Sequence, residues 1–205
     1  MRFTLDDLLF TLEIAAEYSA TYDQYVLQAN GRPRTTDDLV WVATQIAGKK
    51  INLYQLDLDV SARNVEAVCF ANQDGSFDIG ILSGLTAEEE RFVVCKEIFH
   101  ALLDREECRN INLFEHVAST LDAQDDLAVP TRAAAAEELA VIGALEFIFP
   151  YSAREAIMAA ADGRIDAEQL AEQYSIPRRL IDTVFNDDSI AFFRQVMPML
   201  ERTGV

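Results

Sequence analysis

Hydrophobic residues recur every three or four positions along most of this chain, which is the spacing of a buried helix face. The first two such segments are Leu5–Gln28 and Thr36–Gly48, and a glycine such as Gly48 is a common helix end. Further helices are predicted at Thr86–Asp104, Asn110–Leu121, Thr131–Pro150, Ser152–Ala161, Asp166–Tyr174, Pro177–Phe185 and Ser189–Leu200. The pattern therefore predicts a mainly helical protein.

One block between the second and third helices departs from this spacing. Apolar and polar residues alternate over Ile51–Asp59, which indicates a half-buried strand, and Val65–Ala71 is a second, weaker strand. Asn72–Ser76 contains an Asp-Gly turn and leads into Phe77–Leu82, so the last two strands are predicted to form a hairpin. The final strand presents a free edge to an extended peptide, or the sheet is plainly antiparallel and covers one side of the next helix. Both readings stay open.

These elements define the expected fold class and domain organisation. A single alternating block between helical segments is typical of an α+β protein that is mostly helical, with a small three-stranded sheet. Two units are expected: residues 1–150, which contain the sheet and the long helices, and residues 151–205, a small helical C-terminal subdomain.

The predicted helix Thr86–Asp104 carries the most informative polar residues. Its apolar face is interrupted by Lys96, Glu97 and His100. Because residues four apart share one helix face, Lys96 and His100 point the same way. Zinc peptidases use this geometry in the motif H-E-x-x-H, where two histidines bind zinc and the glutamate activates a water molecule. Here the first position is a lysine, and the question of function turns on that residue.

Composition narrows the classes of partner and the cellular compartment. The chain has 205 residues, of which 50% are hydrophobic, and a formal net charge of −18. This negative charge argues against binding nucleic acid through its phosphates. The three cysteines are an odd number and are expected to be reduced, in a cytoplasmic protein. The first residues do not resemble a signal peptide, and no stretch is apolar enough to span a membrane.

Three other features have ordinary structural interpretations. Trp41, the only tryptophan, is predicted to be a core anchor. His116 has no partner at metal-ligand spacing, so a surface or core role is expected. Residues Ala167–Asp182 resemble a helix-turn-helix with Arg178 and Arg179 at the start of its second helix, but in an acidic protein these arginines are expected to make packing or partner contacts rather than to read DNA.

Two motifs together resemble a known family. The segment Arg91–His100, RFVVCKEIFH, is similar to the R-F-T-x-A-H-E-x-x-H motif of ImmA/IrrE-type metallopeptidases. Downstream, Glu137–Pro150 is similar to the E-x-x-A-x-x-F-A-x-x-L-x-x-P helix of that family, although Gly143 stands where phenylalanine is usual. The resemblance covers about Asp37–Phe185, and it picks Glu137 rather than its neighbour as the glutamate of the family.

The resemblance implies a zincin-like core with a two-histidine, one-glutamate zinc site. His100 matches the second zinc ligand, Glu137 the third, and Glu97 the general base of catalysis. Lys96 stands at the position of the first ligand. Asp104, one helical turn beyond His100, is a further candidate ligand. Members of the family often cut or bind repressor-type transcription factors in phage, mobile-element or stress switches.

Two functions follow from this comparison. We expect a degenerate peptidase, without metal, that binds a regulatory protein such as a repressor. The alternative is an active zinc endopeptidase that cleaves a transcriptional repressor, with Glu97 as general base. No nucleic-acid or membrane partner is expected.

The lysine favours the first of these functions. A lysine binds zinc only when neutral, and removing its proton at pH 7 costs about 4 to 5 kcal/mol. A charged Lys96 would instead neutralise neighbouring carboxylates, since buried carboxylates need a cationic partner. We therefore predict a salt bridge from Lys96 to Glu97 or Glu137.

Overall fold

The computed structural model describes residues 3–25, 35–48, 50–57, 66–103, 132–160 and 165–203. The described part of the chain is mainly helical with one three-stranded sheet, which confirms the predicted α+β class. Its helices are α1 (Leu5–Tyr25), α2 (Thr36–Ala47), α3 (Ala87–Leu102), α5 (Arg132–Ile148), α6 (Tyr151–Ala160), α7 (Ala167–Tyr174), α8 (Arg178–Val184) and α9 (Asp187–Thr203). Its strands are β1 (Ile51–Leu56), β2 (Ala67–Ala71) and β3 (Phe77–Leu82).

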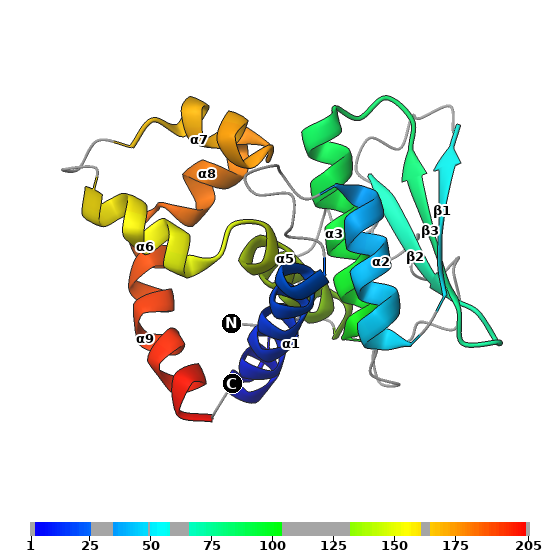
Figure 1. The fold of residues 1–205 in the computed structure, drawn as a ribbon, viewed down its shortest axis with the longest axis horizontal. Helices are drawn as coiled ribbons and strands as arrows, with labels where there is room; N and C mark the ends of the chain where they lie inside the picture. The colour runs from blue at the N-terminus through cyan, green and yellow to red at the C-terminus, as the bar shows by residue number, and fades with distance from the viewer. Residues whose placement is uncertain are drawn as a thin grey trace.

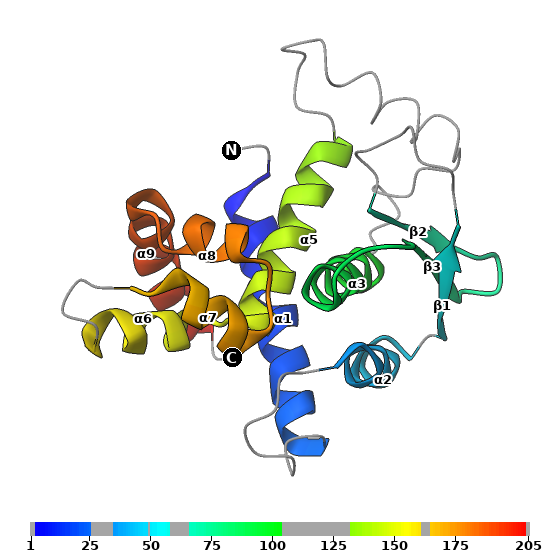
Figure 2. The same cartoon turned by 90° about the horizontal axis from the view of Figure 1, so that it is seen from above.

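The elements are stacked in layers. Figures 1 and 2 show the sheet at one end of the molecule, with α2 and α3 packed side by side against it. Helices α1 and α5 form the next layer, and α6 to α9 lie beyond them. Helix α3 is thus enclosed between the sheet and α5, which explains why it is apolar around most of its circumference.

Local sequence signals set the ends of α2 and α3. Thr86 accepts a hydrogen bond from the backbone of Glu89, and the Glu89 carboxylate accepts one from the backbone of Thr86, so the two residues form a capping box. Thr35 and Asp38 form a second capping box on α2. Gly48 ends α2 with a φ of 59°, a left-handed conformation that glycine adopts without strain.

The strand order corrects one prediction made from the sequence. The order is β1-β3-β2, with β3 antiparallel to β2 and parallel to β1. The β2–β3 hairpin is confirmed. The final strand is central, so it presents no free edge, and the sheet is mixed rather than plainly antiparallel. The alternation of Phe77, Ile79 and Ile81 indicates which face of β3 is buried, but not which strands pair with its two backbone edges. The parallel partner β1 lies 26 positions earlier in register, so the local pattern does not predict it.

The prediction for Trp41 is also wrong, because this side chain is 42% exposed. Helix α2 buries Leu39, Val42 and Ala43, which share one face, and Trp41 lies off that face. Its indole ring packs edge-on against Tyr25 of α1, with 5.7 Å between ring centroids. Helical position therefore outweighs the general tendency of tryptophan to be buried.

The hydrophobic core extends past residue 150. One cluster of buried residues joins α1, α2, the sheet, α3 and α5 to Leu170 of α7 and Ile181 of α8. A second cluster packs α1 against α9, through Leu8, Leu12 and Phe193 among others. The helices expected to form a C-terminal subdomain therefore share their apolar contacts with the preceding helices.

Candidate functional site

Helices α3 and α5 bring the polar residues of the two motifs together. Lys96, Glu97 and His100 come from the middle and end of α3, and Glu137 comes from the first half of α5. The two helices pack directly against each other. The residues selected by the paired motifs therefore converge in space.

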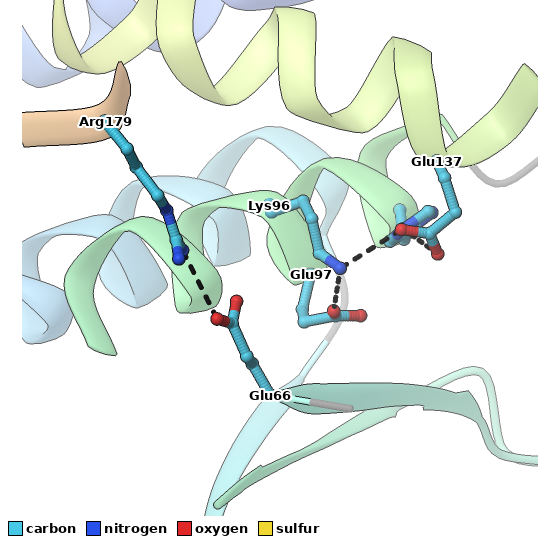
Figure 3. Close-up of polar contacts among 6 residues, drawn as sticks. Glu66, Lys96, Glu97, Glu137 and Arg179 are labelled. Atoms are coloured by element: carbon cyan, nitrogen blue, oxygen red, sulfur yellow. Dashed lines mark hydrogen bonds and ion pairs between the residues drawn. The ribbon is translucent and has the colours of Figure 1, made fainter. Parts of the chain in front are cut away.

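Lys96 lies between two carboxylates (Figure 3). Its Nζ atom is 2.9 Å from Glu97 Oε1 and 3.1 Å from Glu137 Oε2. Only 18% of the Lys96 side chain and 4% of the Glu97 side chain are exposed, whereas Glu137 is 45% exposed. The predicted salt bridge is confirmed, and it joins Lys96 to both glutamates rather than to one.

His100 completes the cluster. Its Nε2 atom lies 3.0 Å from Glu137 Oε1, but the ring is not oriented to direct an N–H bond at that oxygen. Glu137 thus lies between Lys96 and His100, with one carboxylate oxygen facing each of them.

The pKa values reflect this arrangement. Burial alone raises the pKa of Glu137, but the contacts with His100 and Lys96 outweigh it and lower the pKa to about 2. Burial alone lowers the pKa of Lys96, but the adjacent Glu97 and Glu137 raise it above the ordinary value of a lysine. At neutral pH the lysine is therefore protonated, Glu137 is ionised, and no lone pair is available on Nζ.

This donor set does not match a three-ligand zinc site. Zinc sites in peptidases use three protein side chains with free lone pairs. In the described part of the chain, no group of three or more His, Cys, Asp or Glu side chains is arranged to hold a metal ion. His100 and Glu137 supply two donors, and the position of the first ligand holds an ammonium group.

The predicted helix Asn110–Leu121 lies outside the described residues, as do two residues that were singled out from the sequence. Asp104, the further candidate ligand, is one of them. His116, for which a surface or core role is expected, is the other.

Two arginines lie in the surroundings of the cluster, and one of them, Arg179, was expected from the sequence to make a packing or partner contact. Arg91 of α3 is buried, and it donates from Nη1 to the backbone carbonyls of Tyr174, at 2.5 Å, and of Ser175. Arg179 at the start of α8 lies 3.3 Å from Glu66, just before β2 (Figure 3). The contacts of Arg91 hold the end of α7 against α3, and Arg179 and Glu66 form an exposed ion pair between α8 and the start of β2.

A buried ion pair fixes the turn between α5 and α6. Arg154 and Glu146 are 2% and 8% exposed and are bonded to each other, and Glu146 also accepts a hydrogen bond from the backbone of Tyr151 at 2.7 Å. Burial raises the pKa of Glu146 and lowers that of Arg154. Pro150 separates the two helices, so no helical spacing relates Glu146 to Arg154. The one sign of this pair in the sequence is the position of Glu146 within an apolar run.

Comparison with known proteins identifies the family. The IrrE N-terminal-like domain (Peptidase_M78) matches residues 49–183. Among solved structures, a Mycobacterium tuberculosis transcriptional regulator is similar at 15% sequence identity and a TM-score of 0.47. The match covers 86% of this chain and 48% of that structure, so this chain spans about half its length. No curated protein matches this sequence. Among the described helices, none is both long and apolar enough to cross a membrane.

Proposed function

Because this chain belongs to the IrrE N-terminal-like domain family, we propose that it is a degenerate peptidase that binds a regulatory protein partner without cutting it. A repressor-type transcription factor is the class of partner that the family suggests. The observation that carries the proposal is Lys96 Nζ, within 3.1 Å of a carboxylate oxygen of both Glu97 and Glu137.

The charge balance supports a site that works without zinc. A zinc ion would bring positive charge to Glu137 and to the general base, and the Lys96 ammonium brings positive charge to the same two carboxylates. Zinc binds only a neutral lysine. Removing the proton from Lys96 costs more free energy than removing it from a lysine in water, because the pKa of Lys96 is raised. Glu97 is paired with this ammonium and has no metal-bound water to deprotonate, so the base loses its catalytic role.

The family fold is retained, which supports a binding role. Helices α3 and α5 pack against each other and bring the residues of the two motifs together, and Arg91 binds the end of α7 to α3. Loss of catalysis does not require loss of a binding surface, because function belongs to individual sites on a fold rather than to the fold itself. The net charge of −18 disfavours nucleic acid as that partner.

The second candidate is an active zinc endopeptidase, and one observation favours it. His100 Nε2 and Glu137 Oε1 lie 3.0 Å apart, so two groups at ligand positions remain close together. In this candidate a further ligand displaces Lys96 from Glu137, and Glu97 serves as the general base.

Metal content separates the two candidates. The wild-type protein and Lys96→His are purified and measured by elemental analysis after incubation with zinc and removal of the excess. We expect substoichiometric zinc in the wild type and close to one ion per chain in Lys96→His, since the substitution provides the third ligand. The variant Lys96→His/His100→Ala is the matched control and should bind little zinc.

Proteolysis of a repressor substrate provides the second measurement. Stoichiometric zinc in the wild type, together with cleavage that Glu97→Gln abolishes, would contradict the pseudo-peptidase and establish the zinc endopeptidase.

A further inference from the structure

A groove lies away from the Lys96 cluster, where the start of α3 meets α7 and α8. It has a volume of about 510 Å³, which is in the range of sites that bind small molecules or single side chains. In Figure 1, α7 and α8 lie near one end of α3, and residues of all three helices line the groove. None of the residues of the Lys96 cluster is among them.

The lining of the groove carries an excess of negative charge. Four glutamates and two arginines line it, and both arginines are engaged: Arg178 lies 3.4 Å from Glu168, and Arg179 lies 3.3 Å from Glu66 outside the groove. Among the described residues, Glu88 and Glu172 have no ion-pair partner. Glu89 has no ion-pair partner among the described residues either, but its carboxylate accepts the backbone N–H of Thr86, so Glu88 and Glu172 are the two carboxylates of the groove with neither contact.

The position of Glu172 strengthens this charge. It lies in the last turn of α7, where the helix dipole favours a cation, and that turn contains no basic residue. A cation from a ligand would therefore interact favourably with both the carboxylate and the end of the helix.

The floor of the groove is apolar and well supported. Ala171 and Pro177 are part-buried and line it, and Ile176, which is 1% exposed, anchors this segment in the core. The hydrogen bonds from Arg91 to the backbone just before Ile176 fix this floor against α3. Lysine and arginine place their methylene groups on apolar surface while the charged end remains among polar groups, so such a side chain matches both parts of the groove.

We propose that this groove binds a basic, extended segment of a protein partner, with a lysine or arginine side chain placed between Glu88 and Glu172. The aliphatic part of that side chain lies along Ala171 and Pro177. An anionic ligand fits less well, because the glutamates outnumber the arginines and the arginines are already paired. The proposal is independent of whether the Lys96 site holds zinc, since it uses none of those residues.

Fluorescence anisotropy with three labelled pentapeptides tests this inference on the full chain. The basic peptide is Lys-Leu-Lys-Leu-Lys, and glutamine or glutamate replaces its lysines in the neutral and acidic peptides. At 150 mM salt, where charges more than about 8 Å apart are screened, we expect the basic peptide to bind best. Glu88→Gln/Glu172→Gln should weaken its binding about tenfold, since two charge pairs are lost.

Two further variants make the result specific. Glu17→Gln/Glu155→Gln removes the same charge from exposed positions elsewhere and should change the affinity less than about twofold. Arg178→Gln releases Glu168 and should tighten binding about threefold. Equal weakening by both glutamate pairs, absence of binding, or binding of the acidic peptide that Arg178→Gln weakens would overturn the proposal. Circular dichroism checks that each variant is folded.

Discussion

At the scale of single residues, Lys96 matters most for Glu97. Both glutamates contact the ammonium, but the Glu137 side chain is 45% exposed and retains access to water, whereas that of Glu97 is 4% exposed. Removal of the ammonium would leave Glu97 as a buried carboxylate without its cation. The energetic consequence is therefore set by the more buried of the two partners.

We predict that Lys96→Met lowers the free energy of unfolding by about 2 to 4 kcal/mol, measured by urea denaturation at pH 7. Methionine keeps most of the side-chain volume and removes the charge, so the loss reports electrostatics rather than a cavity. Adding Glu97→Gln should restore much of the stability, because a neutral amide is less costly to bury. Lys50→Met, at an exposed position, is the control and should change stability by less than about 0.5 kcal/mol. A neutral effect of Lys96→Met would contradict the role of its charge.

At the scale of elements, Gly143 of α5 leaves room for the Phe99 ring of α3 where the two helices pack together. A Cβ atom at Gly143 would lie 2.3 Å from Phe99 Cδ1, and Phe99 is fully buried. The family resemblance places a phenylalanine at position 143. In this protein the aromatic ring is supplied by α3 instead, and the backbone of α5 lies directly beside it. The glycine is thus needed for close packing rather than for a turn.

We predict that Gly143→Ala destabilises the protein by about 1 to 3 kcal/mol, because Phe99 cannot move away from the added methyl group without disturbing the core. The opposite sign is expected for an unobstructed helix, where alanine is favoured over glycine by about 1 kcal/mol. Thermal unfolding of Gly143→Ala, Phe99→Leu and the double variant measures the coupling between the two sites. The double variant should be more stable than the sum of the single changes; a raised melting temperature for Gly143→Ala alone would refute the packing argument.

At the scale of the whole molecule, the apolar core crosses the boundary expected at residue 150. The matched family region ends at residue 183, and the main cluster of buried residues includes Leu170 and Ile181. The buried pair of Glu146 and Arg154 joins α5 to α6, and the Arg154 guanidinium lies 4.5 Å from the ring centre of Phe193 on α9. Separate unfolding of the C-terminal helices would expose these groups to water.

We therefore predict one cooperative unfolding transition for the whole chain, since a shared core couples the two parts. Trp41 fluorescence reports on α2 in the wild type, and the variant Trp41→Phe/Phe192→Trp moves the probe to α9. Both proteins are unfolded in urea and followed by fluorescence and far-ultraviolet circular dichroism. Fluorescence and dichroism midpoints should coincide within each protein; a lower midpoint for the α9 probe than for the dichroism of the same variant would reveal an independent C-terminal unit.

The sequence by itself determined what depends on neighbouring residues. The helix end at Gly48 and the β2–β3 hairpin follow from residues a few positions apart, so they could be predicted and are observed. The convergence of Glu137 on His100 was also anticipated, but through the likeness of two motifs to a family rather than through physical reasoning on the chain.

The tertiary structure alone decided what depends on distant pairings. No local spacing relates the partners in the parallel pairing of β1 with β3, in the hydrogen bonds from Arg91 to the end of α7, or in the buried pair of Glu146 and Arg154. The exposure of Trp41 likewise depends on how α2 packs against the rest of the protein. The same holds for the double contact of Lys96, since its second carboxylate belongs to another helix. Periodicity indicates which face of an element is buried, whereas the energy of a buried charge depends on the groups that packing brings to it.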